Sequence, residues 1–443
     1  MDGPVVADLT MSSSGHDRVP HRRLPLLYYG TAHVALGLAC LMVGFAPRAV
    51  AGFFYHAWMV AIVHLVTLGW ITSSILGSLY LVLPLAFGRP MPVRWTDYTA
   101  FAFVVIGIVG MVAHFWIEEY GGMAWSAATV TIGVLLVVGR VAVQVTRSHV
   151  PPAVVWHVRL ACLNLGLAAS AGVLLGFDKA FHFLPGFVLT NVFAHAHLAA
   201  IGWATMMVVG VGYRLLPMVL PAQPPAGRTL IVSAVFLEAG TLGLAAALFA
   251  RSSSAVAFGA MVLAGLASFL AHVAQMVRHP ARRPREAPRI DFGVLHAAAA
   301  GASLLVAAGL GTVLLTQPLS PAMLRTALAY GTFGLVGFLA QMVVAMQVRL
   351  VPLLAWYDTY AASGFASIPP NPWTTRDRVL QGIVFISWVV GVPAIAAGLA
   401  YERIPLLAVG AWTLFVGVAV GAVDNASVLW KNRRPHGSVM PRA

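Results

Sequence analysis

Apolar stretches of roughly 20 residues recur along the whole of this chain, and no other feature restricts its fold as strongly. A helix of that length crosses the hydrocarbon core of a membrane, which is about 30 Å thick. The chain is 60% hydrophobic and only 9% charged, which is too little charge for a surface that faces water. The sequence therefore predicts an all-α polytopic membrane protein.

We expect twelve spans, and the distribution of basic residues supports this number. The expected spans cover residues 25–46, 55–86, 97–117, 124–146, 153–176, 186–220, 229–250, 254–277, 292–316, 323–355, 379–401 and 404–429. Most of the 27 Lys and Arg then fall on the side that holds both termini, as the positive-inside rule requires of the cytoplasmic side. We therefore expect a multi-pass protein of a bacterial-type inner (cytoplasmic) membrane, in contact with lipid and with both termini cytoplasmic.

This topology also explains the net charge of +13, so no nucleic-acid partner is expected. Residues 1–23 and 431–443 are interpreted as cytoplasmic tails of a single membrane domain that covers residues 24–430.

An internal repeat divides the domain into three four-helix units, at about 24–146, 153–277 and 292–430. Residues 64–84 (HLVTLGWITSSILGSLYLVLP) and 197–217 (HLAAIGWATMMVVGVGYRLLP) agree at nine of 21 positions. A third copy, residues 332–352, keeps Gly337 and Pro352 but has Thr332 where the other copies have histidine. The repeated helices are spans 2, 6 and 10, so we expect a pseudo-threefold bundle with these three helices lining its inside.

Histidines His64, His195 and His197 are the candidate ligands of a cofactor. Polar side chains at membrane depth are costly and usually serve a site. The repeat places His64 at the depth of His197, whereas His195 and His197 point about 200° apart on one helix. His56, near the end of span 2, is a further candidate. The other membrane histidines (His33, His114, His157, His272 and His296) are expected to be packed and hydrogen-bonded, and His182 to lie at the outer end of span 6.

Imidazoles on two helices at like depth predict haem, because no carboxylate or thiolate accompanies them at zinc-ligand spacing. The haem would be b-type and non-covalent, with one or two groups per chain, since the two cysteines form no CxxCH motif. Gly69 and Gly202 are expected to make room for the macrocycle, with Trp70 and Trp203 as its walls. The alternative is that the histidines bond across the helices without a cofactor.

The segment AHAHLAAIGW (194–203), followed by GVGYRLLP (210–217), resembles the haem-ligand helix of subunit I of the haem-copper oxidases. The likeness is closest to the branch with high oxygen affinity that takes electrons from cytochrome c. The resemblance implies that His195 binds a high-spin haem. It also implies that His197 binds a low-spin haem whose other ligand is His64 or His56. The twelve spans also resemble, more distantly, the NnrS proteins of the nitric oxide response.

The chain departs from the oxidase pattern in two places. The double-histidine helix is span 10 in that family and span 6 here, where span 10 instead carries Tyr330 and Thr332. Span 7 has no histidine, so a copper centre is not expected.

The sequence thus predicts a haem-binding protein of respiratory electron transfer or of nitric oxide or oxygen chemistry. If it is an enzyme, it is a haem-dependent oxidoreductase. The resemblance implies a cytochrome c or another redox subunit as the partner. The sequence allows an oligomer but does not predict one. The alternatives are a true terminal oxidase or nitric oxide reductase subunit, and a transporter without a cofactor.

Acidic residues within the spans are few. Glu238 and Asp424 are either proton relays or hydrogen-bonded interior groups. Asp97, Asp291 and Asp358 are expected to cap helices or to pair with arginines.

Overall fold

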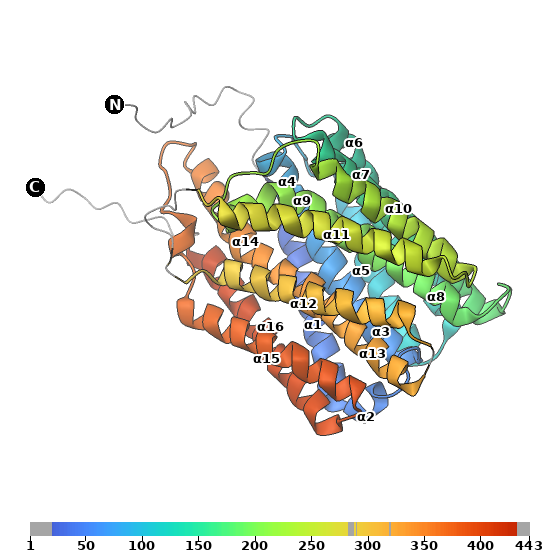
Figure 1. The fold of residues 1–443 in the computed structure, drawn as a ribbon. Helices are drawn as coiled ribbons and strands as arrows, with labels where there is room; N and C mark the ends of the chain where they lie inside the picture. Colours follow the sequence, from blue (N-terminus) through green and yellow to red (C-terminus); the bar gives the residue numbers. More distant parts are fainter. Residues whose placement is uncertain (1–19, 282–287, 289, 319, 432–443) are drawn as a thin grey trace, which may run out of the picture.

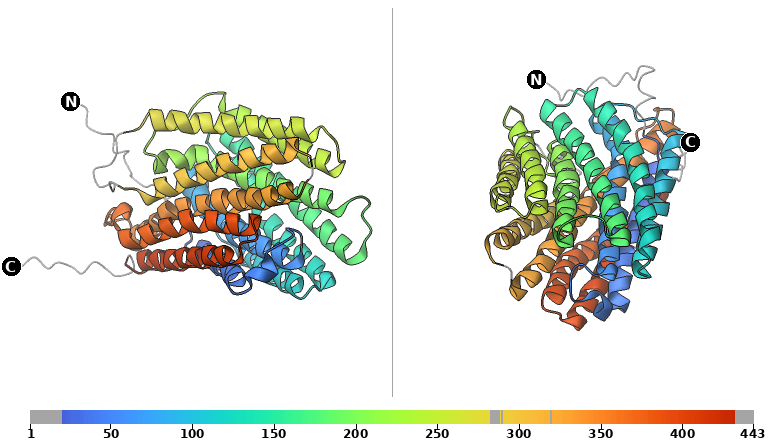
Figure 2. Two further views of the ribbon diagram at one scale, coloured as in Figure 1. Left: turned by 60° about the horizontal axis from the view of Figure 1, so that its bottom comes forward. Right: turned by 90° about the vertical axis from the view of Figure 1, so that its right-hand side faces the viewer.

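The computed structural model describes residues 20–281, 288, 290–318 and 320–431, which form helices and no β-strand (Figure 1). Twelve helices are long and apolar enough to cross a membrane, as the sequence predicts. Both ends of the described chain lie at one end of the bundle, here called the terminal end, and the opposite end is called the far end (Figures 1 and 2). The expected tails fall largely outside the described residues.

Each four-helix unit occupies a continuous part of the chain. The first unit comprises α1 (Arg23–Phe45), α2 (Pro47–Val50), α3 (Ala57–His64), η2 (Leu65–Thr72), α4 (Ser73–Ala86), α5 (Trp95–Trp116) and α6 (Tyr120–Thr146). The second comprises α7 (Pro152–Phe181), α8 (Val188–His197), η3 (Leu198–Thr205), α9 (Met206–Val219), α10 (Leu230–Phe249) and α11 (Ala255–Arg278). The third comprises α12 (Phe292–Thr316), α13 (Pro321–Gly331), η4 (Thr332–Ala340), α14 (Gln341–Ala362), η5 (Pro372–Thr374), α15 (Arg378–Ala400) and α16 (Ile404–Lys431).

The perimeter of the bundle is apolar, as a lipid-facing surface must be. Large aliphatic side chains on outward helix faces are 60% exposed or more, among them Val34, Ile106, Val109, Leu305 and Val423. A surface of this kind would be unstable in water, whereas apolar side chains are at home in the apolar hydrocarbon of a membrane. The helical backbone can enter lipid as well, because it satisfies its own hydrogen bonds.

The three units share one pattern of helix packing. In each unit the first helix (α1, α7 or α12) lies along the second, and the third and fourth helices form a tight antiparallel pair. The second helix of each unit turns inward, and η2, η3 and η4 contact one another in all three combinations. The bundle is therefore pseudo-threefold, with spans 2, 6 and 10 at its centre.

The seams between units differ. Extensive packing of α6 on α7 joins the first unit to the second, and α16 on α1 joins the third to the first. The third seam, between α11 and α12, is much looser.

Each central helix contains a π-helical segment at the same place in the repeat. The segments η2, η3 and η4 end at Thr72, Thr205 and Ala340, which are aligned positions of the three copies. Hydrogen bonds from residue i to i+5 shift the register of the helix, and such segments are frequent at functional sites. The closing prolines Pro84, Pro217 and Pro352 lie inside continuous helices.

Candidate functional site

His64 and His197 each end an α-helical segment directly before a π-helix. His64 Nδ1 donates to the carbonyl of Val60 at 2.8 Å, and His197 Nδ1 donates to that of Phe193 at 2.7 Å. Because Nδ1 carries the proton in both rings, Nε2 carries the lone pair.

His195 points toward the neighbouring helix α7. Its Nδ1 donates to the carbonyl of Ala168 at 2.9 Å, so its Nε2 also carries the lone pair. A Cβ added at Gly172, one turn further along α7, would lie 3.0 Å from His195 Cε1, so this glycine leaves room for the ring.

His197 points toward the third unit. Its Nε2 accepts a hydrogen bond from the hydroxyl of Tyr330 at 3.3 Å, and the two rings are nearly parallel with centroids 6.1 Å apart. The two span 6 histidines thus face different neighbours, as their spacing predicts.

The repeat relates these contacts to one another. His64, His197 and Thr332 are aligned, and so are Ile62, His195 and Tyr330. His197 of the second unit meets Tyr330 of the third, so the pseudo-threefold relation makes His64 of the first unit and His195 of the second the corresponding pair. The remaining combination, Thr332 with Ile62, offers no ligand.

Packing around these side chains is incomplete. None of the eleven residues of α13 is buried, and only Asn191 and Ala194 are buried in α8, although both belong to central helices. By contrast, most residues of α4, α9 and α14 are buried. His64, His195 and His197 are only partly buried, so each ring keeps surface that no protein atom covers. The central helices of the second and third units are therefore less buried in α8 and α13 than in α9 and α14.

His64 and His195 fit the requirements of axial haem ligands. A metal-binding histidine typically donates its other N–H to a backbone carbonyl, which fixes the tautomer and the ring orientation, and both residues do so. Within the described part of the chain, Nε2 of neither ring has a hydrogen-bond partner. No group of three or more His, Cys, Asp or Glu side chains suited to a metal ion occurs among the described residues. Haem does not need one, because the porphyrin supplies four ligands.

The structure gives other contacts to His56, His182 and the expected pocket residues. His56 caps α3: its Nδ1 accepts from the Met59 N–H at 3.3 Å and its Nε2 donates to the Val50 carbonyl at 3.1 Å, so both ring nitrogens have hydrogen-bond partners. His182 is not on span 6. It ends α7 in a left-handed conformation with φ of 53°, and it is exposed.

The expected glycines and tryptophans of a haem pocket instead hold helices together. A Cβ at Gly69 would lie 2.4 Å from Cβ of Ala35, and one at Gly202 would lie 2.8 Å from the Asn164 side chain, so both glycines allow close helix packing. Trp70 and Trp203 are almost fully buried and donate hydrogen bonds to neighbouring units.

The other histidines and most of the acids have structural contacts. His33, His114 and His157 donate to carbonyls of their own helices, and His272 and His296 bond to side chains. Asp97, Asp291 and Asp358 pair with Arg140, Arg349 and Arg22, as predicted. Glu238 accepts a hydrogen bond from Asn164 at 2.6 Å, and Asp424 pairs with Arg376.

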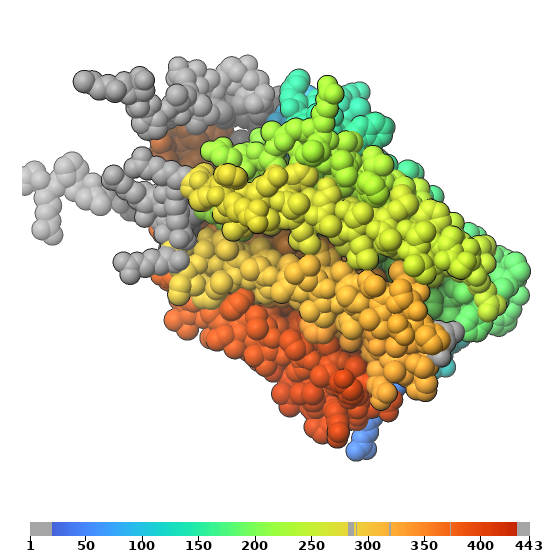
Figure 3. Space-filling model, in the orientation of Figure 1, coloured from blue at the N-terminus to red at the C-terminus, as the bar shows by residue number. Residues whose placement is uncertain are grey.

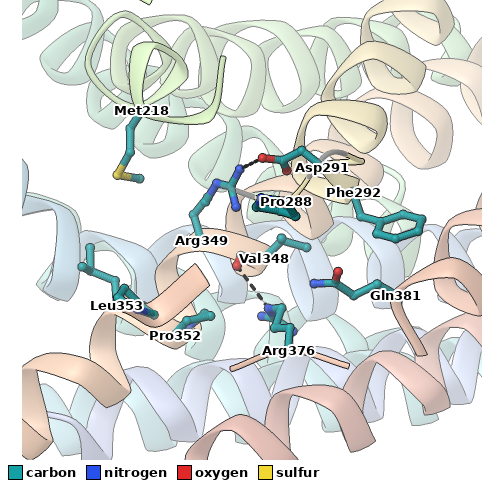
Figure 4. A pocket seen from close by; sticks show the side chains of 11 residues that line it. Met218, Pro288, Asp291, Phe292, Val348, Arg349, Pro352, Leu353, Arg376 and Gln381 are labelled. Carbon is teal, nitrogen blue, oxygen red and sulfur yellow. Dashed lines mark hydrogen bonds and ion pairs between the residues drawn. The ribbon is translucent and has the colours of Figure 1, made fainter. Parts of the chain in front are cut away.

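A polar pocket lies at the terminal end, between α12, α14 and the segment that precedes α15. Its cavity volume is small, about 40 Å³, and Arg349 reaches Asp291 across it (Figure 4). Arg376 borders it and bonds the Val348 carbonyl. Burial lowers the pKa of the Arg376 guanidinium, and Asp424 opposes that shift. Arg349 follows Tyr330 by 19 residues, or roughly 28 Å of helix, so this pocket is separate from the histidine site.

A scan against protein-family models gives no match to this chain, and neither does a search of curated proteins.

Proposed function

We propose that this chain is a haem b-binding integral membrane protein in which His64 and His195 hold one non-covalent haem between the first and second units. The observation that supports this most is that each imidazole is fixed through Nδ1 by a backbone carbonyl while its Nε2 has no partner in the described chain. Two helices of different units present these nitrogens in a loosely packed interior.

The pairing differs from the one that the oxidase resemblance implies, in which His197 would be the partner of His64. His197 already accepts a hydrogen bond from Tyr330, and the repeat makes His195 and His64 the corresponding pair between the second and first units. A haem held by the two imidazoles would supply one-electron transfer. The role of the chain is to fix the orientation of both rings through the carbonyls of Val60 and Ala168.

The same proposal places the protein in respiratory electron transfer or in nitric oxide or oxygen chemistry, as a relative of haem-copper oxidase subunit I. We further propose a bacterial inner membrane with the terminal end cytoplasmic, because the basic residues concentrate there. A redox subunit such as a cytochrome c would supply or accept the electrons.

Absorption and electron paramagnetic resonance spectra of the purified protein test the proposal. The wild-type chain, expressed with ample haem, should show a low-spin haem that acid acetone extracts. His64→Ala and His195→Ala should each convert it to a high-spin or haem-free form. Thr332→Ala, at the aligned position of the third unit, should leave the spectrum unchanged. A colourless wild-type protein, or a low-spin signal that survives both histidine substitutions in folded protein, would refute the assignment.

A further inference from the structure

The loose seam between α11 and α12 is open to the bilayer. Figure 3 shows a furrow between these two helices, and α12 exposes Leu305, Val306 and Val313. The helices do meet closer to the far end, where a Cβ at Gly259 of α11 would lie 2.3 Å from Cδ1 of Leu315. The two helices therefore pack together near the far end, although this seam is the loosest of the three.

Tyr330 lies just inside α12. A Cβ at Gly311 of that helix would lie 3.1 Å from the Tyr330 ring, so the glycine allows the ring to approach. Beyond the ring lies His197, and the surrounding residues of α13 are not buried. The pair His197–Tyr330 is thus only partly buried and lies behind the loose seam.

The depth of this pair limits what can reach it from the membrane. Tyr330 is nine residues after the start of α13, which corresponds to about 14 Å of helix. A charged phospholipid head group stays at the membrane surface, because burying it in hydrocarbon is prohibitively costly. A neutral head group on an apolar tail has no such restriction.

We propose that the space between α8, α11, α12 and α13 binds the neutral head group of a membrane quinone or hydroquinone, which enters between α11 and α12. The hydrogen bond from Tyr330 to His197 is long, at 3.3 Å, so a ligand can replace it at low cost. A quinone carbonyl then accepts from the Tyr330 hydroxyl, and a hydroquinone hydroxyl donates to His197 Nε2. The nearly parallel rings of these two residues offer flat faces to a flat ligand.

This binding site goes beyond the proposed haem, since binding needs no iron. Only the use of the ligand as an electron carrier for a haem at His64 and His195 rests on the proposed function.

Calorimetric titration of the full-length protein in lipid nanodiscs with a decyl-substituted benzoquinone tests the proposal. We expect saturable binding at one site per chain and an affinity about tenfold weaker for Tyr330→Phe, which loses one hydrogen bond. Tyr98→Phe, on the lipid-facing side of α5, should bind like the wild type. If Tyr330→Phe proves unfolded by circular dichroism, His197→Gln replaces it with the same expected loss.

Two further measurements make the result decisive. His64→Ala should bind the quinone normally, which separates this proposal from that of the haem. A tail-less sulfonated benzoquinone should bind much more weakly than the decyl compound, since it does not partition into the bilayer. Any of three results would overturn the proposal. They are quinone uptake no greater than that of empty nanodiscs, equal quinone affinity of Tyr330→Phe and wild type, and tighter binding of the tail-less compound.

Discussion

The indole Nε1 of Trp203 donates a hydrogen bond to the Thr72 hydroxyl at 3.1 Å, and this bond joins the second unit to the first. Trp70 makes the corresponding bond from the first unit to the third, to the carbonyl of Ala340 at 3.1 Å. Thr72 and Ala340 are aligned residues, so the two bonds obey the pseudo-threefold relation. The third position of the cycle holds Phe338, which has no donor.

Trp203→Phe should lower the free energy of unfolding by about 1–3 kcal/mol, because it removes this buried bond and leaves the Thr72 hydroxyl without its donor. Thermal unfolding in detergent measures the effect. Trp125→Phe is the control, because Trp125 is 67% exposed on the perimeter, and it should change the midpoint little. Equal thermal midpoints for the two variants would show that this hydrogen bond does not stabilise the packing of the three four-helix units.

Gly69→Ala should destabilise the protein by about 1–3 kcal/mol through overpacking, because its Cβ would lie 2.4 Å from that of Ala35. Gly30→Ala, on α1, meets no atom within 4 Å and serves as the control. Thermal midpoints and haem content are measured together. An unchanged midpoint with a lower haem content would instead restore Gly69 to the haem pocket.

Gly172→Val should weaken haem binding about tenfold or more, because the added atoms displace His195, and groups that orient a ligand influence metal affinity on this scale. Gly166→Val on the same helix is the control, since its nearest neighbour is the Leu135 side chain at 3.5 Å. Haem titration of the stripped protein gives both affinities. Equal affinities would place the haem away from α7.

Arg376→Gln should cost about 3–5 kcal/mol, because it leaves Asp424 as an unpaired charge within the bundle. Adding Asp424→Asn should recover part of that loss. Asp358→Asn breaks the more exposed pair with Arg22 and should cost less than about 1 kcal/mol. The free energies of unfolding of the wild type, the two single variants and the double variant test these expectations. A double variant no more stable than Arg376→Gln would contradict the expected recovery.

Elemental analysis of the coloured protein should find iron without stoichiometric copper. Span 7, from which the oxidases take copper ligands, contains no histidine here. One copper per chain, together with rapid oxygen reduction by the isolated protein, would favour the terminal oxidase instead.

The sequence predicts the twelve helices and their threefold arrangement because hydropathy and the repeat depend on many residues at once. The partner of His64 could not be predicted in the same way. Spacing shows that His195 and His197 diverge, but not which of them faces the first unit. The rotation of α8 depends on its packing and on the register shift in η3, which no residue pattern reveals.

Small residues mislead for a similar reason. From the sequence, the missing side chains of Gly69 and Gly202 suggest free space for a ligand. The structure shows that the Ala35 and Asn164 side chains occupy that space. His182 lies on α7 because that helix continues to Phe181, five residues beyond the expected end of span 5, and helix ends are the least certain part of a sequence-based prediction.

The tryptophan bonds run in a single rotational sense, from the second unit to the first and from the first to the third. A closed ring of three separate, identical four-helix chains would make such head-to-tail contacts. In a trimer of that kind, every substitution appears three times, and the three seams must remain alike. Joining the units in one polypeptide removes this constraint, which allows one seam to keep two histidines, the next a histidine and a tyrosine, and the third Ile62 and Thr332. Covalent fusion thus lets a symmetric framework carry three different interiors.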